Sequence, residues 1–80
     1  QLLCDTSMTG VIIDRFGAGV AMRPYDDTHI LARAQVAVSP QFFGWLAGLS
    51  THIRVISPDS VVNEYQIFLQ EILRSYTDMQ

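Results

Sequence analysis

The sequence predicts an α+β domain: a ferredoxin-like sandwich of order βαββαβ, followed by a long C-terminal helix. Apolar residues alternate with polar ones along segments of strand length, and other segments carry apolar residues at helical spacing. Two Ser-Pro pairs, Ser39-Pro40 and Ser57-Pro58, are typical of helix starts. An antiparallel sheet with helices on one face accounts for this order of elements.

The first half of the chain predicts a strand, a helix and a hairpin. Residues 1–6 form a short strand, and a helix capped by Thr6 or Ser7 runs to Phe16. Gly17 then stands where a left-handed residue ends a helix. Residues 20–25 form a strand, a polar turn follows, and residues 29–38 form the most regular strand. The apolar positions that alternate in this last strand are Ile30, Ala32, Ala34, Val36 and Val38.

The second half predicts two helices separated by a strand. Ser39 caps a helix whose apolar stripe is Phe42, Trp45, Leu46 and Leu49. We expect Trp45 in the core, with a place at a domain boundary as the alternative. Residues 53–56 form a strand, Ser57-Pro58 starts the last helix, and this helix runs to about residue 76. Its broad apolar face consists of Val61, Val62, Tyr65, Phe68, Leu69, Ile72, Leu73 and Tyr76.

Eighty residues form one domain, spanning residues 1–80. The chain is 49% hydrophobic and 16% charged, which is apolar for its size. Either a dense core or a surface that meets a partner explains this composition. Because the chain begins at Gln1 in strand-like sequence, without an initiator methionine, we expect it to be an excised fragment of a longer protein.

Charge and cysteine content exclude several classes of protein. The net charge is −3, with five arginines and no lysine, which argues against strong nonspecific DNA binding. The single cysteine, Cys4, excludes an intrachain disulfide and a multi-cysteine zinc site. No apolar run reaches the roughly 20 residues that span a membrane, and no signal peptide is visible. We therefore expect a cytoplasmic protein without a membrane partner.

The residues do not predict a catalytic or metal site. Asp26, Asp27 and His29 form a local cluster, but they lie in a turn and supply too few fixed ligands. His52 stands alone before a strand, and Cys4 has no activating neighbour in the sequence. No phosphate-binding glycine loop is present. The sequence thus predicts a protein that is not an enzyme and needs no cofactor or metal.

Strand alternation predicts a surface rich in arginine. If the apolar strand positions face the helices, Arg23, Arg33 and Arg54 point from the opposite face with Tyr25 and Gln35. This face is either an ordinary solvated surface or a site for an anionic ligand or a subunit. Leu31 and Ile56 fall among the arginines, and Ile67 interrupts the polar side of the last helix. We take these three apolar residues as candidate interface positions.

Three segments resemble one known family. They are Asp-Arg-Phe-Gly at residues 14–17, Val-Ser-Pro-Gln-Phe-Phe-Gly-Trp-Leu at residues 38–46, and Ile-Arg-Val-Ile-Ser-Pro at residues 53–58. With the hairpin and the final helix, they resemble the C-terminal extension of WYL-domain transcription regulators. The Trp-Tyr-Leu motif of that family belongs to the preceding domain and is absent here, so no functional residue is carried over.

The resemblance implies a regulatory domain without catalytic activity. In this family, a winged helix-turn-helix and a WYL domain precede the extension. The resemblance therefore implies a bacterial transcription regulator, homodimeric, whose WYL and extension domains sense an effector and transmit its binding to the DNA-binding domain. Because some relatives respond to nucleic acid or nucleotide-like ligands, the alternative is a module that binds such an effector directly on the open sheet face.

Overall fold

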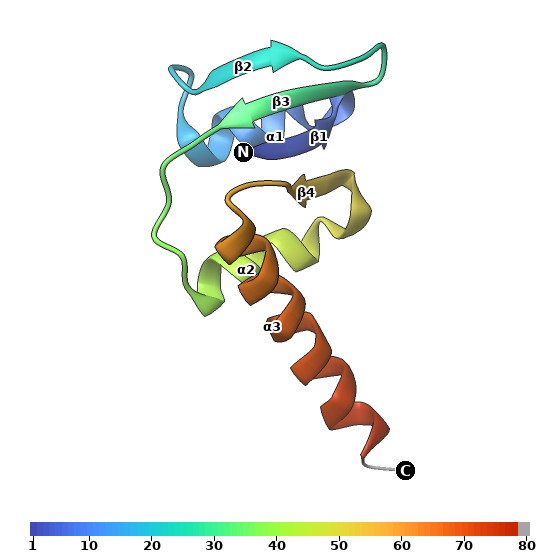
Figure 1. The fold of residues 1–80 in the computed structure, drawn as a ribbon. Coiled ribbons are helices and arrows are strands. Elements are labelled where there is room, and N and C mark those ends of the chain that lie inside the picture. The colour runs from blue at the N-terminus through green and yellow to red at the C-terminus, as the bar shows by residue number, and fades with distance from the viewer. Residues whose placement is uncertain (79–80) are drawn as a thin grey trace.

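The computed structural model describes residues 1–78, and its central feature is a four-stranded antiparallel sheet of order β2-β3-β1-β4 (Figure 1). The last two residues of the predicted domain lie outside the described part. The strands are β1 (Leu2–Asp5), β2 (Ala21–Pro24), β3 (His29–Arg33) and β4 (Ile53–Val55). The helices are α1 (Thr9–Phe16), α2 (Pro40–Gly48) and α3 (Asp59–Thr77), with 3-10 turns at Thr6–Met8 and Ser50–His52. The α+β class, the antiparallel sheet and the C-terminal helix are confirmed.

The core lies on one face of the sheet, under α1 and α2. Leu2 and Cys4 of β1 are buried together with Ile12 of α1 and Leu46 of α2. Because side chains alternate along a strand, the residues between them belong to the opposite face. Ala32 of β3, Ile53 of β4, Phe42 and Phe43 complete the buried cluster.

Helix α2 starts as the sequence predicts. The Ser39 hydroxyl accepts a hydrogen bond from the Phe42 amide at 3.2 Å, and Pro40 occupies the first helical position. Trp45 is half-buried between helices: its ring meets Phe16 of α1 edge-on at 5.6 Å, and the Arg15 guanidinium lies 5.2 Å from its centre. Phe43, which falls outside the predicted stripe, is buried as well.

The other predicted helix boundaries need correction. Neither Thr6 nor Ser7 caps α1; a 3-10 turn precedes the helix, and no side chain caps it. Helix α3 begins one residue later than predicted, at Asp59, and Ser57 does not cap it. At the end of α1, Gly17 has the predicted positive φ of 91°, but its ψ of 160° lies outside the left-handed helical region.

Two segments of the chain, the connection after β3 and the second half of α3, lie outside the sheet and its core. Strand β3 ends at Arg33, so residues 34–38, predicted as strand, form an irregular connection to α2 (Figure 1). Helix α3 packs only its first half against the domain: the Phe43 ring contacts those of Tyr65 and Phe68 at tilted angles, with centroids 5.3 and 5.4 Å away. The second half projects away from the sheet (Figure 1), and the molecule measures 44 × 25 × 22 Å as a result.

The buried position of Ile12 yields a matched test of the core. Ile12 is fully buried, whereas Ile67 on α3 is 53% exposed, and both lie in helices. We expect Ile12→Val to lower the free energy of unfolding by about 0.5–1.5 kcal/mol, because it removes a buried methylene group. Ile67→Val changes helix propensity in the same way and should stay within about 0.5 kcal/mol of the parent. Urea unfolding measures both, and equal losses would contradict this core.

Candidate functional site: the open face of the sheet

The face of the sheet opposite the helices carries the predicted arginines. We call it the open face; its strand residues are Leu3, Asp5, Ala21, Arg23, His29, Leu31, Arg33 and Arg54. The register sets Leu31 opposite both Leu3 and Arg23, and Leu3 opposite Arg54. One row therefore crosses all four strands, with Arg23 and Arg54 at its ends, roughly 14 Å apart along the sheet.

Arg23 and Arg33 border a shallow hollow on the open face. Arg33 stands opposite Ala21, one pleat along from the row of Arg23. The hollow has a volume of about 300 Å³ and is lined by both arginines together with Gln1, Ala21 and Leu31, among others. Within residues 1–78, no carboxylate lies within 4.0 Å of an arginine side chain. The hollow is therefore positively charged and suits an anion.

The other predicted site residues differ in how well they fit this face. Tyr25 follows β2, is 59% exposed, and donates its backbone N–H to the His29 carbonyl at 3.0 Å, beside the face. Gln35 lies beyond the end of β3, so strand alternation does not assign it to the face. Leu31 is only 9% exposed, whereas Ile56 and Ile67 are 36% and 53% exposed. These three apolar residues come from separate elements.

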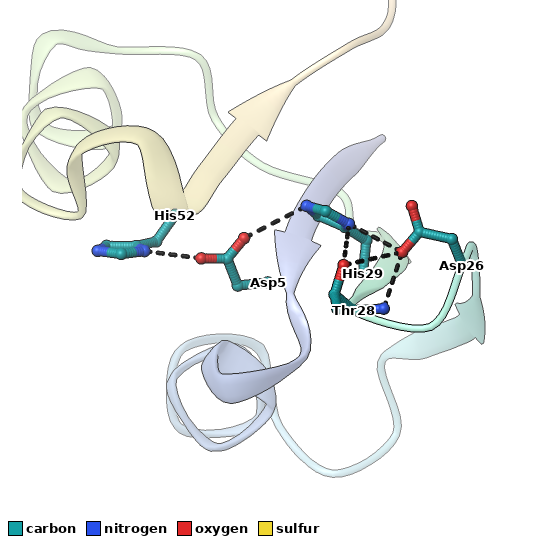
Figure 2. A network of polar contacts seen from close by, with 5 residues as sticks. All are labelled: Asp5, Asp26, Thr28, His29 and His52. Carbon is teal, nitrogen blue, oxygen red and sulfur yellow. Dashed lines mark hydrogen bonds and ion pairs between the residues drawn. The ribbon is translucent and has the colours of Figure 1, made fainter.

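One edge of the open face holds a polar network of which the sequence analysis identified only the Asp26–His29 part (Figure 2). His29 Nδ1 lies 2.8 Å from Asp26 Oδ1, and His29 Nε2 lies 3.5 Å from Asp5 Oδ1. His52 Nδ1 lies 2.7 Å from the other Asp5 oxygen. Asp5 thus bridges β3 and the residue before β4. The antiparallel register of β1 and β3 places Asp5 opposite His29. The contact between Asp5 and His52 joins residues that are 47 positions apart, so the sequence alone gives no signal for it.

The network stabilises the turn between β2 and β3, and its residues do not form a metal-binding or catalytic arrangement. The Thr28 backbone N–H donates to Asp26 Oδ1 at 2.9 Å, and this bond, helped by His29, lowers the pKa of the Asp26 carboxyl. The side chains of Asp5, Asp26, His29 and His52 are between 35% and 57% exposed, so each ion pair contributes little stability. Across residues 1–78, no group of His, Cys, Asp and Glu side chains is arranged to hold a metal ion.

Cys4 is a core residue rather than a nucleophile. It is fully buried in the cluster beneath the helices. Burial, with a smaller contribution from the neighbouring Asp5 carboxylate, raises the pKa of the Cys4 thiol to about 11. The thiol is therefore protonated at neutral pH, and a protonated, buried thiol is a poor nucleophile.

The fold and the open face describe a small α+β domain with arginines on its exposed sheet face and no assembled catalytic group among residues 1–78. Comparison with protein families is more specific: the WCX domain model matches residues 2–73, and the chain belongs to that family. The WCX domain is the C-terminal extension of WYL-domain regulators, which confirms the resemblance found in the sequence. It is a domain associated with regulation and not a known catalytic family. No curated protein and no solved structure matches the chain.

In the part of the chain that the structure describes, no helix has the length and apolarity needed to cross a membrane.

The lowered pKa of Asp26 predicts a specific acid response. Because the pKa of the folded state lies below its ordinary value of 3.8, ionised Asp26 stabilises the fold above about pH 4. This stabilisation is lost as the pH falls through the lowered pKa. We expect Asp26→Asn to unfold more easily than the parent at pH 6, with the difference shrinking toward pH 2.5 in urea unfolding.

The neighbouring residue supplies the control for this measurement. Asp27 lies in the same turn and is exposed, and no hydrogen bond or ion pair within residues 1–78 involves its side chain. Asp27→Asn should leave the pH dependence of stability close to that of the parent. Equal responses of the two variants would mean that the Thr28 and His29 bonds do not stabilise the Asp26 carboxylate.

Proposed function

We propose that this chain is the C-terminal part of a bacterial, cytoplasmic WYL-family transcription regulator and acts there as a non-catalytic regulatory and dimerisation domain. It helps to sense an effector and transmits the resulting conformational signal to upstream WYL and helix-turn-helix domains. The match of the WCX family model over residues 2–73 carries this proposal, because the family suggests a WYL-associated regulatory role. The protonated, buried thiol of Cys4 is consistent with a non-catalytic domain.

The exposed half of α3 supports the proposed dimer. Apolar residues recur along α3 at spacings that alternate between three and four residues, which is typical of a helix that packs along another helix. They are Val62, Tyr65, Leu69, Ile72 and Tyr76. Tyr65 packs against α2, but Leu69, Ile72, Leu73 and Tyr76 are 40, 45, 68 and 68% exposed. We call these four residues the α3 stripe. An apolar stripe that continues past the core favours a partner helix.

A second copy of the chain is the partner that suits the α3 stripe. Closed twofold dimers are the commonest oligomers, and in them the same patch serves both subunits. The charged residues of this half, Glu71 and Arg74, lie away from the stripe on the helix, so no charge opposes pairing. The stripe offers roughly 400–500 Å² per copy, against about 800 Å² in a standard interface. We therefore expect α3 alone to form a weak dimer, which other surfaces of the regulator strengthen.

The stripe replaces the scattered interface positions suggested by the sequence. Ile67 lies on the opposite side of α3 from Ile72 and Tyr76, because an α-helix turns by about 100° per residue. Leu31 has little surface left for a partner, and Ile56 lies beside the sheet, away from the stripe. Leu31 and Ile56 belong to the proposal only as part of additional contacts.

The two sides of α3 allow a controlled test of dimerisation. Leu73→Glu introduces a charge into the stripe, and we expect it to weaken the dimer at least about tenfold in sedimentation equilibrium of the full-length regulator. Ile67→Glu introduces the same charge on the opposite side and should change the dissociation constant much less. A strict monomer in both the fragment and the full-length protein would refute the dimer.

The open face favours a second candidate function, direct binding of a nucleotide or single-stranded nucleic acid. The hollow between Arg23 and Arg33 is the specific observation, since guanidinium groups bind phosphate oxygens bidentately. Stacking side chains are scarce on this face: Tyr25 beside it is the aromatic residue that the sequence offers to a base. Phosphate contacts would therefore dominate such binding and make it sensitive to salt.

This second function has its own substitution test. Arg33→Ala and Arg54→Ala should each weaken binding of a fluorescent oligothymidylate to the intact regulator and reduce its salt dependence by about one released counterion. Arg74→Ala on α3 removes the same charge away from the open face and should have little effect. If all three variants bind equally well in a fluorescence anisotropy titration, the open face is not the nucleic-acid site.

We also infer that the sandwich is ferredoxin-like. Helix α1 connects β1 to β2, and β3 lies between these strands in the sheet. Helix α2 connects β3 to β4 in the same way, with β1 between them. Two such split βαβ units are what a ferredoxin-like sandwich requires. The common burial of Ile12, Phe42 and Leu46 with one face of the sheet also supports this inference.

A further inference from the structure

The connection between β3 and α2 has backbone groups without partners. Among residues 1–78, no backbone hydrogen bond reaches an amide or carbonyl group of residues 34–38. The segment nevertheless continues the alternation of β3, and Val36 and Val38 are 36% and 42% exposed. A segment with strand-like sequence, free backbone groups and exposed valines is a template for a further strand.

A groove runs beside this segment. Its volume is about 510 Å³, and its lining joins Ala34, Val36 and Val38 to Phe42 of α2 and to the Ser57–Pro58 connection, among other residues. Gln1 also lines the groove, and its backbone nitrogen donates to the Ser57 carbonyl oxygen at 2.9 Å. The groove therefore lies where β1 would continue if the strand were longer.

The hydrogen-bond pattern of β3 predicts the direction that these backbone groups take when the segment continues the strand. The Thr6 amide donates to the Thr28 carbonyl at 2.8 Å, and in the same register Cys4 pairs with Ile30 and Leu2 with Ala32. In an antiparallel ladder every second residue bonds to the same neighbour, so even-numbered residues of β3 direct their backbone groups toward β1. The Tyr25 amide donates to the His29 carbonyl, which assigns the odd-numbered residues to β2.

We propose that the groove is filled by a β-strand of the longer regulator, namely the segment that leads directly into Gln1 and prolongs β1. In the β1–β3 register, the residue before Gln1 pairs with Ala34, and five residues, about 17 Å of strand, reach Val38. Continuity with the existing ladder favours this occupant over a separate peptide. The inference rests on the proposed function only in requiring a longer chain.

The proposal specifies the sequence pattern of this strand. Once residues 34–38 pair as a continuation of β3, Ala34, Val36 and Val38 fall on the core face of Ala32, so the first, third and fifth residues before Gln1 face Phe42 and are apolar. The second and fourth face the same side as Arg33. Charged residues at all three core-facing positions contradict the proposal without any further experiment.

Hydrogen exchange at single-residue resolution in the full-length regulator tests the pairing. The amides of Ala34, Val36 and Val38 should exchange at least about 100-fold more slowly than those of Gln35 and Ala37, which face away from the new strand. Similar rates at all five amides overturn the proposal. Protection that increases with protein concentration indicates a strand from a second copy and overturns it as well.

A pair of proline variants separates pairing from general burial. Val36→Pro removes an amide that would bond to the new strand and should abolish the slow exchange at Ala34 and Val38. Ala37→Pro removes an amide that faces away and should preserve it. Equal loss in both variants overturns the proposal. Because sedimentation of the same samples reports the dimer separately, failure of this strand and failure of the proposed dimer are distinguishable.

Discussion

Pairing of β1 on both of its edges is the constraint on which the rest of the structure depends. The strand has only four residues, Leu2–Asp5, yet it hydrogen-bonds to β3 and β4 and so holds the two halves of the chain in one sheet. Its alternation sends Leu2 and Cys4 into the core and Leu3 and Asp5 to the open face. A shift of one residue in the pairing of this strand would exchange those faces, which would disrupt both the buried core and the row of residues between Arg23 and Arg54.

Local patterns in the sequence predicted most of the fold because they depend on few residues. The Ser39 cap and the strand alternation followed from spacing, and the arginine face followed from that alternation. The network of Asp5 and His52 was not predictable in this way, since it depends on long-range register. The sequence also identified the apolar face of α3 but not which half is covered, because coverage depends on where the helix leaves the domain.

The structure shows where the many apolar residues of this chain lie. The core of buried residues is small and lies under α1 and α2. Much of the exposed apolar surface lies instead on the α3 stripe and on Val36 and Val38 beside the groove. A dense core would have left these residues covered. The high apolar content of the chain therefore reflects exposed surface on these two segments as well as the buried core.

The two candidate binding surfaces are physically connected through one residue. Gln1 lines the anion-favouring hollow beside Arg33 and also the groove beside Val36. A strand that entered Gln1 through the groove would run past the hollow, with its second residue before Gln1 on the same face as Arg33. An anion bound by Arg33 would then contact the polypeptide that leads toward the proposed upstream domains. Differential contact of this kind is what a regulator requires, because a ligand shifts a conformational equilibrium only by binding one state better than the other.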